Sequence, residues 1–129
     1  MFRTHGTLTF TPGGFSAEYR LDGDNCLIEY DGLNAVQRRS GHLTFIMQFS
    51  RGERTECVLL EGGTKFSFPI FTQSLSASVS EEGCTLRLVY LQGEERERTE
   101  VLFSAEHWRE REQRPQINVK TTDGAGCLH

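Results

Sequence analysis

The chain has 129 residues, a length that suits one domain and allows roughly two thirds of the unfolded surface to be buried without disulfides or metals. Fourteen lysines and arginines against eighteen aspartates and glutamates give a formal net charge of −4, which argues against a protein that binds nucleic acid through its overall charge. Hydrophobic residues make up 36% of the chain and nine residues are phenylalanine, so the composition argues against a disordered chain.

Apolar and polar residues alternate from residue 7 to residue 103, the period of half-buried β-strands. Turn residues separate the first runs, with Pro12-Gly13-Gly14 and Asp22-Gly23-Asp24-Asn25 as the clearest signals. A third turn is predicted at Asp31-Gly32 and a fourth at Ser40-Gly41. The strands predicted in this first part cover residues 7–11, 15–21, 26–30, 33–39 and 42–49.

The same pattern continues in the second part of the chain, where strands are predicted over residues 55–60, 66–70, 74–80, 86–90 and 99–103. Pro69 lies inside one of these runs and has no backbone N–H, so that strand is expected at a sheet edge or at a bulge. About nine or ten short strands with local turns predict an all-β antiparallel meander. An up-and-down β-barrel is favoured over a sandwich because a barrel pairs every strand edge.

The character of the chain changes after Ser104. We expect a barrel domain over residues 1–104 and a charged tail over residues 105–129. Residues 106–114 carry alternating charges with the spacing of two helical turns, and Pro115 ends this segment. The remainder is expected to be loose.

A series of short signals runs through residues 6–103: Gly6-Thr7-Leu8, Gly13-Gly14-Phe15, Glu18-Tyr19, Arg39-Ser40-Gly41, Met47-Gln48-Phe49 with Gly52, Gly63, Phe66, Thr72, and residues 82–90. In their order and spacing these signals resemble the YwiB-like family of bacterial proteins of unknown function. The resemblance implies a calycin-type, lipocalin-like β-barrel. Family members carry a further strand before the Gly6 position, so this barrel is expected to stay open, or to be closed by the tail or by a partner chain. The lipocalin G-x-W signature is absent, because the single tryptophan is Trp108.

Aromatic residues and one arginine are the candidate binding residues. In a barrel they would point inward, where they either fill the core or line a ligand cavity. The candidates are Tyr19, Tyr30, Arg39, Phe45, Phe66, Phe68 and Tyr90. Arg39 shares the face of Leu33 and Ala35, and an inward arginine needs either an internal carboxylate or an acidic ligand as its partner.

No motif of catalysis is recognised. The chain lacks G-x-S-x-G and the glycine-rich phosphate loops, and its histidines are not spaced as metal ligands, so neither an enzyme, a cofactor nor a metal site is expected. The cysteines (Cys26, Cys57, Cys84 and Cys127) are expected to be reduced. No apolar run approaches about 18 residues and no signal peptide is recognised, which favours the cytoplasm and no membrane partner.

Two functions remain open. The first is a non-enzymatic barrel that binds a small, partly apolar ligand, with an acidic group as one option. The alternative is a protein-interaction module without a cavity, pairing through an exposed strand edge or through the tail around Trp108, with a homodimer as one such pairing. Fold similarity alone does not choose between them.

Overall fold

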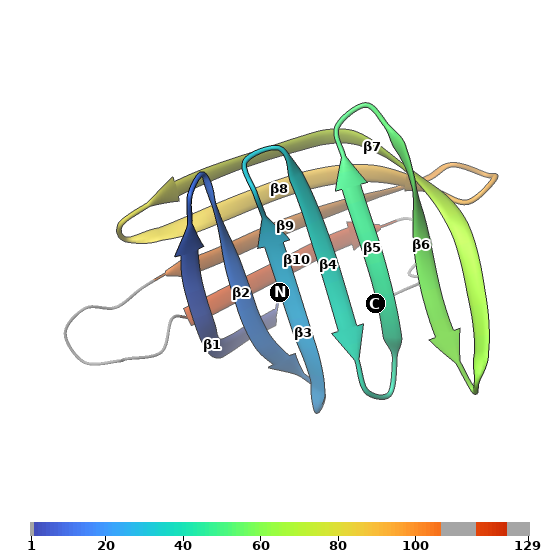
Figure 1. Ribbon diagram of the computed structural model, residues 1–129, viewed down its shortest axis with the longest axis horizontal. Coiled ribbons are helices and arrows are strands. Elements are labelled where there is room, and N and C mark those ends of the chain that lie inside the picture. The colour runs from blue at the N-terminus through green and yellow to red at the C-terminus, as the bar shows by residue number, and fades with distance from the viewer. Residues whose placement is uncertain (1, 107–115, 124–129) are drawn as a thin grey trace.

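The computed structural model describes residues 2–106 and 116–123, and every element in these ranges is a β-strand (Figure 1). In chain order the strands are β1 (Phe2–Thr11), β2 (Gly14–Leu21), β3 (Asp24–Tyr30), β4 (Asn34–Ser40), β5 (Thr44–Ser50), β6 (Arg54–Glu61), β7 (Thr64–Ser80), β8 (Gly83–Gln92), β9 (Glu97–Glu106) and β10 (Gln116–Asp123). A helix able to span a membrane is therefore not found in the described part of the chain.

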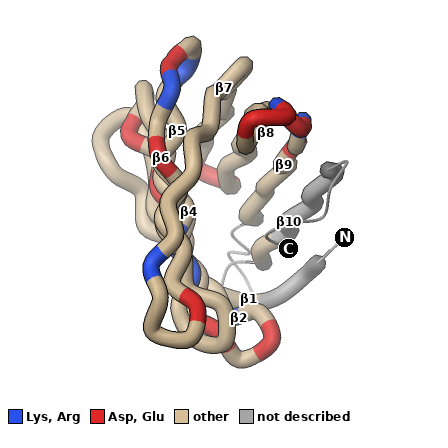
Figure 2. Tube along the Cα trace, turned by 90° about the vertical axis from the view of Figure 1, so that its right-hand side faces the viewer, with Lys and Arg blue, Asp and Glu red and all other residues tan. Residues whose placement is uncertain are grey.

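Each strand pairs antiparallel with the next strand along the chain, which makes the sheet a meander. The all-β antiparallel architecture predicted from the alternation is confirmed. Seen from two directions, the sheet is curled so that β2–β6 form one layer and β8 and β9 lie in a second layer facing it (Figures 1 and 2).

β10 corrects the prediction of a loose tail. This strand pairs with β9 over its full length and with β1 through four residue pairs, from Phe2↔Val119 to His5↔Gln116. Unpaired backbone N–H and C=O groups along the start of β1 would need other partners, and β10 supplies them. The sequence signal was present, because Ile117, Val119 and Thr121 alternate with polar residues. The predicted helical turns lie in residues 107–115, outside the described residues.

β7 is a single strand of 17 residues, where the sequence predicted two. Its pairing with β8 shifts register between Thr72 and Ser74, which marks a β-bulge. Before the bulge the inward residues are even-numbered, as in Ile70, and after it they are odd-numbered, as in Leu75. The bulge therefore explains why the apolar–polar alternation in the sequence shifts by one residue within this strand. β7 is not an edge strand, since it pairs with both β6 and β8; it carries the bulge that was the other expectation from Pro69, which itself precedes the first residue paired with β8.

The core joins the two layers through aromatic contacts. Phe15 of β2 stacks on Phe103 of β9 with ring centroids 5.7 Å apart and an interplanar angle of 6°. Phe49 of β5 meets Tyr90 of β8 at 5.1 Å in a tilted arrangement. These rings are buried, so packing between strands that are distant in sequence holds the curled sheet together.

Candidate functional site

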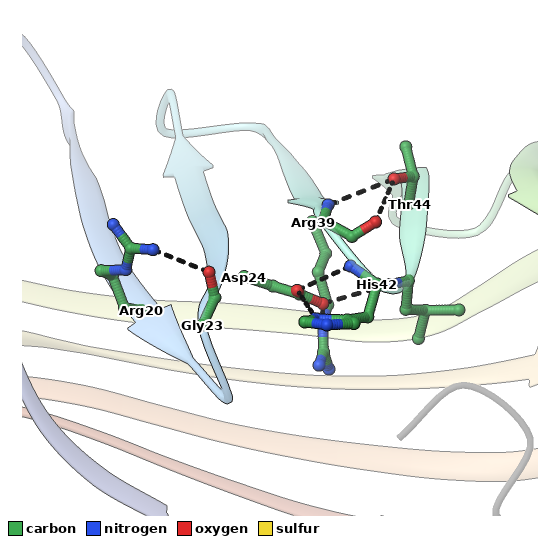
Figure 3. A network of polar contacts seen from close by, with 8 residues as sticks. Arg20, Gly23, Asp24, Arg39, His42 and Thr44 are labelled. Atoms are coloured by element: carbon green, nitrogen blue, oxygen red, sulfur yellow. Dashed lines mark hydrogen bonds and ion pairs between the residues drawn. The ribbon is translucent and has the colours of Figure 1, made fainter.

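The most densely bonded polar group in the described chain is the carboxylate of Asp24, at the start of β3 (Figure 3). It accepts hydrogen bonds from the backbone N–H groups of His42 (2.7 Å) and Leu43 (3.1 Å) and from Nε of Arg39 (2.8 Å). Nδ1 of His42 lies 3.0 Å from its Oδ1. The side chain of Asp24 has no exposed surface, so this carboxylate ties β3 to the β4–β5 turn from inside.

Arg39 points inward from β4, as its strand parity predicts. It lies opposite Cys26 on β3 and Phe45 on β5, and its side chain is 12% exposed. Its anionic partner in this structure is the protein's own Asp24, which is the internal ion pair that the sequence left as one alternative. Burial raises the pKa of the neighbouring Tyr19, an effect that the charge of Arg39 partly opposes.

The stability of the protein at acid pH should depend on the ionisation of Asp24. Hydrogen bonding, above all from the backbone N–H of His42, holds the pKa of this carboxyl well below its usual range. The stabilisation is therefore complete above the unfolded-state pKa of about 3.9 and is lost as the pH falls below it. We expect the difference in urea midpoint between the wild type and Asp24→Asn to be constant above about pH 5 and to shrink steadily as the pH falls from about 4 toward 2. A difference between them that does not change with pH would contradict this assignment.

A hollow of about 920 Å³ lies against the β1–β6 layer. Its lining consists of short runs from six strands: His5, Gly6, Thr7, Glu18, Tyr19, Arg20, Asn25, Cys26, Leu27, Arg38, Arg39, Ser40, Thr44, Phe45, Ile46, Val58 and Leu60. Because side chains alternate along a strand, each run contains residues of both faces of the sheet.

The outward face of the sheet borders this hollow. The inward side chains of Tyr19, Cys26 and Phe45 are at most 6% exposed, so they do not face an open space of this size. The outward side chains of Ile46 and Leu60 are 37% and 47% exposed. β6 contributes its outward residues to the lining but not the inward residue between them, which places the open space outside the core.

Arg38 lies in the middle of an aliphatic row on this outward face. Strand register aligns Leu27, Arg38, Ile46 and Val58 across β3, β4, β5 and β6. Arg38 is exposed, and the described residues offer it neither an ion pair nor a hydrogen bond. Arg20, the other outward arginine of the hollow, donates a hydrogen bond to the carbonyl of Gly23 at 2.8 Å (Figure 3).

The candidates named from the sequence are distributed over several environments. Tyr19, Arg39 and Phe45 lie beneath the hollow on the inward side of the sheet. Tyr30 and Phe68 are half-buried and pack against the core, and Tyr90 is fully buried against Phe49. Phe66, near the start of β7, is 48% exposed.

Sequence reasoning missed the residues that border the hollow from outside. A signal for them existed, because Leu27, Ile46, Val58 and Leu60 are apolar at positions where the alternation expects polar residues. Asp24 was missed for a different reason. It belongs to a turn signal, and nothing in the local sequence shows that its carboxylate reaches the β4–β5 turn.

Three cysteines, Cys26, Cys57 and Cys84, are buried and are not disulfide-bonded. Burial raises the pKa of Cys84 to about 12 and also raises the pKa of Cys26, so both thiols stay protonated at neutral pH and are poor nucleophiles. In the ranges that the structure describes, no group of three histidine, cysteine, aspartate or glutamate residues is placed to hold a metal ion.

Neither a protein-family model nor a curated protein matches the sequence. The chain is similar to a solved structure, the crystal structure of the YwiB protein from Bacillus subtilis, with a TM-score of 0.65 and 14% sequence identity. The similarity covers 96% of this chain and 78% of that chain. At this identity it shows the fold alone, and a YwiB-like fold is what the order of short sequence signals predicted.

Proposed function

We propose that this chain is a non-enzymatic, cytoplasmic protein with a closed, calycin-type barrel, and that it binds a small, acidic, partly apolar ligand. The site is the hollow on the outward face of β3–β6. The observation that carries the proposal is Arg38, an exposed cation with no partner among the described residues, set between Leu27 and Ile46.

Charge and shape both favour such a ligand. A guanidinium group recognises a carboxylate through two parallel hydrogen bonds, and Arg38 has its donors free for this. Covering exposed aliphatic surface contributes about 25 cal/mol per Å², and Ile46 and Leu60 expose a large part of their surface. The volume of about 920 Å³ is within the range of small-molecule sites.

The alternative of pairing through a free strand edge has less support. β10 pairs with both β9 and β1, so the first and last strands of the meander are already partnered. Homodimer formation through the hollow would compete with a ligand for the same exposed side chains. Native mass spectrometry of the purified protein distinguishes the two outcomes. A bound ligand adds its own mass to one chain, and a homodimer has the mass of two chains.

Arg38→Gln should weaken the binding of an anionic amphiphile about tenfold. A suitable probe is 8-anilino-1-naphthalenesulfonate, titrated against the folded protein with fluorescence as the readout. Arg98→Gln is the matched control, since it removes the same charge from an exposed position on β9, outside the hollow. Equal weakening in both variants, or no saturable binding by the wild type, would refute the proposal.

A further inference from the structure

We infer that the ligand of this hollow is an unbranched aliphatic monocarboxylate of about eight to ten carbons, with its carboxylate on Arg38 and its chain lying across Ile46 and Val58 toward Leu60. This inference rests on the proposed function and adds the chemical class and the orientation of the ligand.

The polar end of the ligand is assigned to Arg38 because the other outward arginine is already engaged. Arg20 donates to the carbonyl of Gly23, and Glu18 lies two residues away on the same face of β2. A carboxylate near Glu18 would meet a like charge. The head group therefore lies on β4, and the chain of the ligand runs away from β2.

The apolar end follows from the strands on the other side of Arg38. Ile46 is directly opposite Arg38 on β5, and Val58 is directly opposite Ile46 on β6. Leu60 lies two residues further along β6 and is 47% exposed. Together they form an aliphatic track that begins at the guanidinium group. Lys65 pairs with Leu60 but is not among the residues that line the hollow, so we place the apolar end of the ligand on Leu60, short of Lys65.

The length of the track sets the length of the ligand. Two strand spacings of about 4.8 Å separate Arg38 from Val58, and two residues along β6 add about 7 Å. An extended chain advances roughly 1.2 Å per bond. Because these two displacements are perpendicular, Leu60 lies about 12 Å from Arg38, so eight carbons reach Val58 and about ten reach Leu60.

The test is a calorimetric titration of the wild-type protein with hexanoate, octanoate, decanoate and dodecanoate below their micelle concentrations. We expect affinity to rise about twofold per methylene, half the gain of complete burial, and to level off at about ten carbons, so that dodecanoate gains little over decanoate. Val58→Thr should weaken decanoate several-fold more than hexanoate. Val36→Thr, an outward valine of β4 outside the hollow, should change neither.

The experiments distinguish a failure of this inference from a failure of the proposed function. Binding that depends on Arg38 but not on chain length would overturn this inference and leave the proposed function standing. Tighter binding of the matching ten-carbon dicarboxylate would overturn the apolar far end. Absence of binding by every acid and by the fluorescent probe would overturn both.

Discussion

Replacing Phe103 with alanine is expected to lower the free energy of unfolding by about 3–5 kcal/mol. Phe103 is 2% exposed and stacks on Phe15, and its ring centroid lies 6.2 Å from that of Tyr19. These contacts connect β9 in one layer with β2 in the other, so the cavity left by alanine opens where the two layers meet. Urea unfolding followed by circular dichroism measures the loss.

Phe66→Ala is the control for this prediction, since it makes the same chemical change at a side chain that is 48% exposed. We expect it to cost less than about 1 kcal/mol. Similar losses in the two variants would mean that the contact between the layers contributes little, and that the strand pairings alone determine stability.

Asp24→Asn is expected to lower the melting temperature by roughly 10 °C. The substitution keeps the size of the side chain but turns an amide toward the N–H groups of His42 and Leu43 and toward Arg39. Arg39 then loses its anionic partner at a position that is only 12% exposed. Differential scanning calorimetry measures the effect, and Glu29→Gln, which neutralises an exposed carboxylate on the same strand, should leave the melting temperature within about 2 °C.

Gly41 provides a second way to disturb the same carboxylate. A Cβ atom at this position would lie 2.1 Å from Oδ1 of Asp24, and the φ of Gly41 is +146°, a conformation that favours glycine. Gly41→Ala should therefore push the carboxylate out of its bonds. Combined with Asp24→Asn, it should cost less than the sum of the single variants. Additive losses would show that Gly41 acts independently of Asp24.

Local alternation was enough to find most of the strands and the inward direction of Arg39, because side-chain direction depends only on position along a strand. It failed at two places for identifiable reasons. β7 was divided in two because a bulge reverses the phase of the alternation. β10 was missed because the charged segment before it dominated the interpretation, although its own alternation was readable.

Local alternation predicted neither the hydrogen bonds of Asp24 nor the row of residues that borders the hollow. The bond from Asp24 to the N–H of His42 spans 18 positions of sequence and exists only because β3 and the β4–β5 turn meet at one end of the layer. The hollow is bordered by outward residues of β3, β4, β5 and β6 that strand pairing places in one row. Register between strands places Arg38 beside Ile46, and register is a property of the paired sheet.

The β class, most strand positions and turns, and the face to which each side chain belongs follow from the amino-acid order, since these depend on backbone propensity and a period of two residues. Three features emerge only in the folded chain: β10 lies between β9 and β1, the partner of Arg39 is Asp24, and the open space borders the outward face of the sheet. These features depend on strand register and on how the sheet curls, and both are set by packing between residues far apart in the chain.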